Sequence, residues 1–314
     1  MAIIKVDDVS VRYITGDFKD IGLKEFVVRK LKGNYHVHEF WADRHISFEL
    51  EEGDMLGIIG TNGAGKSTLL KTISGIMVPT EGRIRVKGSI AALLELASGF
   101  DPDLTVRENT YLRGALLGYT RAFMNEMYEQ IIDFAELRDF QDHAFKQLSS
   151  GMKSRLAFSI ASLVNPDILI LDEVLAVGDG AFREKSGKKM KEILAGGVTG
   201  LLVSHSIGQV REMCNKILWL DHGRQITFGG QVRELCDAYE EFLITRQLPE
   251  NEEDIRQLAA DFQVRCEQMR KKAQRTEAEK LQAVLEQGTS EAAVEASLNI
   301  LRKMRPEMFR KDVE

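Results

Sequence analysis

The sequence predicts an α/β fold built around a largely parallel sheet, followed by a helical C-terminal segment. Two observations predict it. Through residues 1–235, short apolar runs of strand length alternate with stretches of helical periodicity, the pattern of successive strand–helix–strand units. From Cys236 onward glycine is absent until Gly288, and Glu, Lys, Arg, Gln and Ala dominate. Because those residue types favour helix, the chain changes from a sheet-containing domain to a helical segment.

Five short apolar runs are the predicted strands, and residues 101–165 are predicted to be mostly helical. The runs are Ile3–Val6, Met55–Ile59, Ile168–Leu171, Leu201–Val203 and Ile217–Leu220. Within 101–165, the residues spaced to share one helix face are Met124, Met127, Ile131 and Phe134. We expect this region to be a helical subdomain inserted in the α/β domain.

An apolar seam with three- and four-residue spacing runs through the start of the C-terminal segment. Its members are Ile255, Leu258, Phe262, Cys266, Met269 and Ala273. The seam then weakens, because Thr276 and Lys280 take the next places. Gly288–Ser290 indicates a helix break and a new cap, and a second helix follows with Val294, Leu298 and Leu301. The sequence therefore predicts a helical hairpin or a short coiled coil over residues 251–305.

Composition argues against several classes of protein. Of 314 residues, 44% are hydrophobic and 29% are charged, the balance of an ordinary globular protein rather than a disordered one. The longest apolar runs, such as Ile168–Leu171, fall far short of the roughly 18 residues that a membrane-spanning helix needs. A formal net charge of −6 argues against a general nucleic-acid binder, since duplex binding depends on Lys and Arg. Cys214, Cys236 and Cys266 show no CxxC spacing, so no disulfide framework or zinc site is expected.

The strongest motif is a glycine-rich loop between a predicted strand and a predicted helix. The pattern GxxxxGK[ST] is matched in full by Gly60, Thr61, Asn62, Gly63, Ala64, Gly65, Lys66 and Ser67, with Thr68 next. We call Gly60–Thr68 the phosphate loop. Its glycines let successive backbone N–H groups point at phosphate oxygens, and the helix N-terminus adds its dipole. Lys66 supplies a positive charge for the β- and γ-phosphates and Ser67 a hydroxyl for Mg²⁺, so a nucleoside triphosphate site is expected.

Two adjacent acids follow another predicted strand. The apolar run Ile168–Leu171 leads directly into Asp172 and Glu173, and ligands of open α/β sheets bind at such strand ends. Acids at this place are costly without a cation or another partner. We expect Asp172 to hold Mg²⁺ through a water molecule and Glu173 to polarise the water that attacks the γ-phosphate.

Further motifs resemble those of ABC ATPases, a family of P-loop NTPases. Leu148–Met152 resembles the family's LSGGQ signature, with Ser150 at the first glycine and Met152 at the glutamine. In that family the signature contacts the γ-phosphate bound to the other subunit, which implies that Ser149, Ser150 and Gly151 bind nucleotide. The resemblance also implies three further roles. Asp179 belongs to the D-loop, His205 senses the γ-phosphate, and Tyr13 stacks on adenine.

One departure from the family pattern concerns metal binding. The glutamine that ABC ATPases use as a Mg²⁺ ligand has no match, and Glu95 is its expected replacement. The forms LLEL-x-x-GF, LSSGM and DEVLAVGD together resemble the ATP-binding subunits of exporters for bacterial polysaccharides: O-antigens, capsular polymers and teichoic acids. The amphipathic stretch Leu23–Leu31, with His38–Ala42 after it, fits an insertion that in similar exporters lies near the polymer entrance.

The resemblance implies a two-domain motor subunit. Residues 1–245 would be an ABC ATPase domain, with its helical subdomain at 101–165, and residues 246–314 a helical extension outside the resemblance. Two copies would sandwich two ATP molecules with Mg²⁺ and would bind a separate membrane permease. This implies a peripheral location at the cytoplasmic face of the cell membrane, a polysaccharide substrate handled mainly through the permease, and no nucleic-acid partner.

Two other functions remain open from the sequence. The first is a soluble ABC ATPase acting on ribosomes or DNA, although such proteins usually join two ATPase halves or carry very long coiled coils. The second is an assembly scaffold that works through the helical extension. Co-purification with a permease would separate the first alternative from a transporter, and loss of ATPase activity without loss of function would favour the second.

Overall fold

The computed structural model describes residues 2–16, 37–92, 99–164, 166–172, 180–204 and 206–286. The chain divides into two compact units, Met1–Arg233 and Glu234–Glu314. The division falls inside helix α8 (Val232–Thr245). The functional boundary expected at residue 245 remains a prediction.

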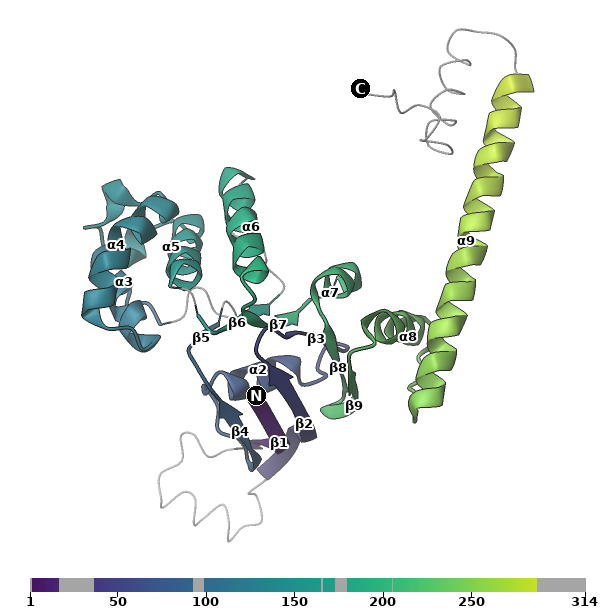
Figure 1. The fold of residues 1–314 in the computed structure, drawn as a ribbon, viewed down its shortest axis with the longest axis horizontal. Helices are drawn as coiled ribbons and strands as arrows, with labels where there is room; N and C mark the ends of the chain where they lie inside the picture. Colours follow the sequence, from purple (N-terminus) through teal and green to yellow (C-terminus); the bar gives the residue numbers. More distant parts are fainter. Residues whose placement is uncertain are drawn as a thin grey trace. The chain divides into compact units, whose positions relative to one another are not determined.

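The first unit contains a mixed sheet with the strand order β4-β1-β2-β9-β8-β3-β7-β6-β5 (Figure 1). The strands are β1 (Ala2–Gly16), β2 (Val37–Glu51), β3 (Met55–Ile59), β4 (Glu81–Val86), β5 (Ile90–Ala92), β6 (Ile168–Asp172), β7 (Thr199–Val203), β8 (Lys216–Asp221) and β9 (Arg224–Gly229). Strands β8, β3, β7, β6 and β5 pair in parallel. The prediction of a parallel sheet is therefore confirmed for this part of the sheet.

The antiparallel part of the sheet was not predicted. Strand β1 pairs with β2 and β4, and β8 pairs with β9, in the antiparallel sense. His222 and Gly223 join β8 to β9 with φ angles of 44° and 75°, and so short a connection can only join antiparallel neighbours. Strands β4 and β9 contain no continuous apolar run, because much of each is exposed or half-buried.

All five predicted strands are confirmed. They correspond to β1, β3, β6, β7 and β8. Every residue of β3 and β7 is buried, which is why these strands read as unbroken apolar runs rather than as alternating ones. Helix α2 (Lys66–Ile73) packs on this sheet through Leu69, Leu70 and Ile73, and its first turn carries the end of the phosphate loop.

The region expected to be a helical subdomain, residues 101–165, is mostly helical in the structure. It contains α3 (Val106–Leu116), α4 (Arg121–Ala135), α5 (Ser150–Leu163) and the short 3₁₀ turns Arg138–Phe140 and Phe145–Gln147, and Figure 1 shows the three α-helices gathered together. Their shared core includes Met124, Tyr128, Ile131, Leu156 and Ile160. Helix α5 begins at Ser150, because the side chain of Ser149 caps it.

Two further helices described in the first unit are α6 (Gly180–Ala195) and α7 (Ile207–Met213).

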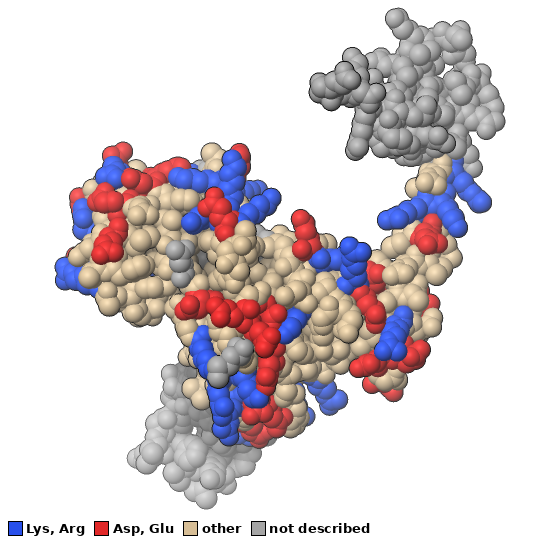
Figure 2. All heavy atoms as spheres, viewed as in Figure 1, with Lys and Arg blue, Asp and Glu red and all other residues tan. Residues whose placement is uncertain are grey.

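Figure 2 shows Lys and Arg side chains interspersed with Asp and Glu on the visible face of this unit.

The second unit contains most of α8 and the long helix α9 (Glu252–Glu286). The predicted seam lies on α9, where Ile255 and Leu258 are buried but Met269 is 61% exposed. Arg265 donates two hydrogen bonds to Glu241 of α8, at 2.9 and 2.5 Å. The predicted break at Gly288–Ser290, the helix after it and the stretch Leu23–Leu31 lie outside the described residues.

None of the helices in the described ranges is both long enough and apolar enough to cross a membrane.

Candidate nucleotide-binding site

The phosphate loop connects the buried strand β3 to helix α2. Gly63 and Gly65 have φ angles of 80° and 106°, which other residues rarely adopt. Gly65 is the N-cap of α2, so the loop turns sharply just before the helix. A helix N-terminus leaves backbone N–H groups without intrahelical partners, and these groups suit an anion.

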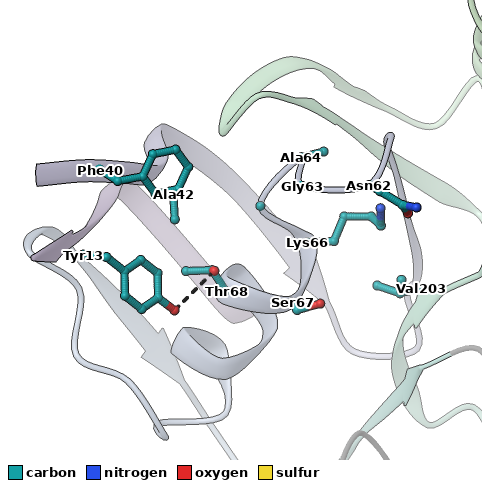
Figure 3. A pocket seen from close by; sticks show the side chains of 11 residues that line it. Tyr13, Phe40, Ala42, Asn62, Gly63, Ala64, Lys66, Ser67, Thr68 and Val203 are labelled. Atoms are coloured by element: carbon teal, nitrogen blue, oxygen red, sulfur yellow. Dashed lines mark hydrogen bonds between the residues drawn. The ribbon is translucent and has the colours of Figure 1, made fainter. Parts of the chain in front are cut away.

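A pocket of about 340 Å³ lies at this loop. It is lined by Tyr13, Phe40, Ala42, Asn62, Gly63, Ala64, Gly65, Lys66, Ser67, Thr68 and Val203 (Figure 3). The set contains Lys66 and six other residues of the phosphate loop. The remaining lining residues lie on β1, β2 and β7. The volume is in the range typical of small-molecule sites.

Lys66 folds over the start of its own loop. Its Nζ atom donates hydrogen bonds to the carbonyl oxygens of Gly60 at 2.7 Å and Thr61 at 2.9 Å. The Thr61 hydroxyl in turn donates to Oδ1 of Asp221 at 3.4 Å. These contacts hold an ammonium group at the pocket wall, where an incoming phosphate can compete for it.

An aromatic wall stands at the other side of the pocket. Tyr13 and Phe40 are opposed across the β1–β2 ladder and are 37% and 60% exposed. The Tyr13 hydroxyl lies 3.5 Å from Oγ1 of Thr68 and donates to the sulfur of Met77 at 3.2 Å (Figure 3). Two accessible rings beside a phosphate-binding loop can contact a flat base.

Phe40 lines the pocket but is not among the site residues predicted from the sequence, where it belongs to the run His38–Ala42. The available signal was alternation: in a strand Phe40 and Ala42 share one face, and both line the pocket. That signal becomes informative only when β2 is known to lie beside β1.

The signature residues occupy the start of helix α5. The side chain of Ser149 accepts a hydrogen bond from the Met152 N–H at 3.2 Å, and Ser150 and Gly151 form the first turn. None of Ser149, Ser150 and Gly151 is among the residues that line the pocket. Within one chain, then, these three predicted residues do not line the pocket at the phosphate loop.

The predicted acids and the histidine are described only in part. Asp172 is the last residue of β6, and its backbone pairs in register with that of Val203, which lines the pocket. Asp172 thus ends β6, and its role in holding Mg²⁺ stays a prediction. Glu95, Glu173, Asp179 and His205 lie outside the described residues.

One acid near the loop has a strongly shifted pKa. Asp43 of β2 has 0% of its surface exposed, and burial raises the pKa of its carboxyl group to about 7. A Cβ atom on Gly65 would come within 2.0 Å of Asp43 Oδ1, so the carboxyl group lies directly behind the loop.

The residues present fit a nucleotide with its metal ion. The loop offers backbone N–H groups at a helix N-terminus, Lys66 offers an ammonium group, and Ser67 lines the pocket with a hydroxyl. This set of groups binds phosphate oxygens and Mg²⁺ in NTP-hydrolysing proteins. The aromatic wall provides a surface for the base.

Comparison with known proteins agrees with this geometry. The ABC transporter family matches residues 44–176. The teichoic acids export ATP-binding protein TagH of Bacillus anthracis is 39% identical over 284 residues, which are 87% of this chain and 51% of that protein. The chain thus spans about half the length of this relative. The O-antigen export system ATP-binding protein RfbB of Klebsiella pneumoniae is 43% identical over 65% of this chain and 81% of that protein.

Solved structures show the same fold. An ATP-binding subunit of an ABC transporter superposes with a TM-score of 0.56 at 21% identity, over 82% of this chain and 99% of that chain. An ATP-binding cassette solved as a dimer with ADP and Pi gives a TM-score of 0.53 at 22% identity, over 72% and 98% of the two chains. The fold has a pocket at the phosphate loop, and the chain covers 81% of the RfbB protein of Klebsiella pneumoniae at 43% identity. The chain therefore belongs to the ABC transporter family of ATP-binding proteins.

Proposed function

We propose that this chain is the ATP-hydrolysing motor subunit of an ABC transporter that exports a cell-surface polysaccharide of the O-antigen, capsule or teichoic-acid type. The observation that carries the proposal is the pocket in which the phosphate loop meets the aromatic wall of Tyr13 and Phe40. The names of the relatives, which are export ATP-binding proteins for teichoic acids and O-antigen, support the class of substrate.

In this proposal the pocket orients ATP by its two ends. The N–H groups of the phosphate loop and the ammonium of Lys66 bind the β- and γ-phosphates, and Lys66 exchanges its carbonyl partners for phosphate oxygens. Tyr13 and Phe40 contact the adenine. Ser67 and Asp172, with Glu95 as the third candidate, would hold Mg²⁺, which supplies charge neutralisation for phosphoryl transfer when bound.

Hydrolysis would depend on residues after β6 and β7. Glu173 polarises the attacking water as a general base, and His205 contacts the γ-phosphate. Because the signature residues do not line the pocket of their own chain, we propose that Ser149, Ser150 and Gly151 close the site of a second copy, with Asp179 near the contact. ATP then joins two copies and hydrolysis releases them.

The work of this cycle would be passed to a separate membrane permease. Polymer contact would run mainly through that permease, and the chain would be held at the cytoplasmic face of the membrane by it. Residues 1–245 would form the motor and residues 246–314 a helical extension.

The experiment is genetic complementation combined with purification. Deleting the gene should abolish surface polymer, and the wild-type chain should restore it and co-purify with a permease; the Lys66→Ala chain should co-purify but not restore the polymer. Full restoration by Lys66→Ala would contradict the motor role. Recovery with ribosomes or DNA in place of a permease would favour a soluble ABC ATPase, and activity that needs only the helical extension would favour a scaffold.

A further inference from the structure

Asp43 is a buried carboxyl group without a partner behind the phosphate loop. Neither of its carboxyl oxygens has a hydrogen-bond partner among the described residues, although buried polar groups are nearly always paired. The close approach of Oδ1 to Gly65 places the group against the backbone of the N-cap of α2. Movement of Asp43 toward a polar partner would therefore displace the loop.

Backbone hydrogen bonds fix the surroundings of this carboxyl group. The N–H of Gly223, in the β8–β9 turn, donates to the carbonyl oxygen of Ala64 in the phosphate loop at 3.0 Å. The N–H of Arg44, next to Asp43, donates to the carbonyl oxygen of Gly223 at 2.7 Å. The loop, the turn and β2 are thus tied together around Asp43, and water has no access to it.

The charged groups on the surrounding elements make other contacts or are exposed to solvent. They are Lys66 on the phosphate loop, Asp221, His222 and Arg224 at the β8–β9 turn, Arg44 on β2 and Arg12 on β1. Lys66 donates to loop carbonyls, and Asp221 accepts from Thr61 and lies 3.9 Å from His222. Arg12 and Arg44 lie over the ring of Trp41 at 5.4 and 5.2 Å, and Arg224 is exposed. Burial therefore dominates the titration of Asp43.

We propose that Asp43 is a positioning residue that must carry a proton when the phosphate loop binds a nucleoside polyphosphate, so that nucleotide binding takes up one proton at this carboxyl group. The inference rests on the proposed function, since it requires nucleotide in the loop. Phosphate groups bring negative charge to the other side of a thin layer of backbone, and like charges favour the protonated carboxyl group. An ionised Asp43 would also draw the loop N–H groups and the Lys66 ammonium away from the phosphates.

The sign of the pH effect follows from linkage. Below the pKa of about 7, Asp43 is protonated both with and without nucleotide. In that range the titration of Asp43 does not make the nucleotide affinity depend on pH. Above that pH the free protein has lost the proton and the complex keeps it, so affinity falls as pH rises, by up to about tenfold per pH unit. Replacement by a neutral residue removes this fall.

The experiment is calorimetric titration of the full chain with MgADP, which is not hydrolysed, at pH 6.5, 7.5 and 8.5 in buffers of different ionisation enthalpy. Wild type should take up close to one proton more at pH 8.5 than Asp43→Asn, because the titration of the nucleotide itself is common to both. Asp43→Asn and the apolar Asp43→Leu should bind at pH 8.5 at least tenfold more tightly than wild type. A purely structural role for Asp43 would instead weaken binding in both variants at every pH.

Two controls locate the proton. Glu49→Gln changes an exposed carboxyl group on the same strand and should behave as wild type. If Asp221→Asn rather than Asp43→Asn abolishes the extra proton uptake, or if wild type and both Asp43 variants share one pH profile, the inference is overturned while nucleotide binding stands. No binding of MgADP or MgATP at pH 6.5 would overturn the proposed function as well.

Discussion

Tyr13 on β1 and Phe40 on β2 are direct partners in the antiparallel ladder, and both side chains line the pocket beside the phosphate loop. Opposed residues of an antiparallel pair project from the same face of the sheet, so the two rings form one surface. Phe40 is the more exposed ring, at 60% against 37% for Tyr13, whereas the Tyr13 hydroxyl contacts Thr68 and Met77.

This pairing predicts that both rings contribute to ATP affinity. Phe40→Ala and Tyr13→Ala should each weaken ATP binding about 5- to 100-fold, the loss expected for one aromatic ring stacked on a base. Ile14→Ala is the matched control, because Ile14 is exposed on the same strand but does not line the pocket. Titration with a fluorescent ATP analogue measures the affinities, and an unchanged affinity in Phe40→Ala would show that β2 takes no part in base binding.

Lys66→Ala should weaken ATP binding about 10- to 100-fold, because the triphosphate loses a charge-assisted hydrogen-bond donor. The same substitution at Lys71, on the same helix but outside the pocket, should leave affinity within about twofold of wild type. Equilibrium binding of ATP to the purified variants is the measurement. Equal losses in the two variants would mean that charge in general, rather than the Lys66 position, attracts the nucleotide.

Glu173→Gln should abolish ATP hydrolysis while ATP binding persists, because the amide cannot accept the proton of the attacking water. With hydrolysis blocked, ATP should hold two copies together, and size-exclusion chromatography with and without ATP should reveal the dimer. Normal turnover by this variant would exclude Glu173 as the general base. Combining it with Ser149→Ala should lower the ATP-dependent dimer fraction if the signature residues close the partner's site.

The ion pair between α8 and α9 predicts that the stability of the second unit depends on pH. Hydrogen bonds from Arg265 lower the pKa of the Glu241 carboxyl group below the ordinary value for glutamate. A lowered pKa stabilises the folded unit above the unfolded pKa, and that contribution is lost as pH falls below about 4.5. Amide protection factors in α8 and α9 should therefore drop in acid, and Glu241→Gln should reduce this pH dependence.

Replacing Arg265 alone should lower the amide protection factors of α8 and α9 more than replacing Glu241 does. Arg265→Met leaves Glu241, which is 2% exposed, without its partner, and should lower the protection factors at neutral pH by at least about tenfold. Arg256→Met is the control, since Arg256 pairs with exposed acids on its own helix. Similar protection in Arg265→Met and Arg256→Met would show that the pair does not fasten α8 to α9.

The phosphate loop, the buried parallel strands and the helical segment at 101–165 could all be predicted from the amino-acid sequence. These features are local: nine consecutive residues contain the loop chemistry, and strands buried on both faces appear as unbroken apolar runs. Ser149 could likewise be assigned to a helix start, because a cap acts on N–H groups two or three residues away.

The places of Phe40 and Asp43, in contrast, could be found only in the folded structure. In the sequence they belong to the run His38–Arg44, in which polar and apolar residues are mixed and nothing distinguishes a site from a surface strand. Pairing of β2 with β1 brings Phe40 to the pocket, and packing against Gly65 and the β8–β9 turn buries Asp43. Such positions depend on contacts between residues far apart in the chain, because burial and its effect on a pKa are properties of the surroundings and not of the residue itself.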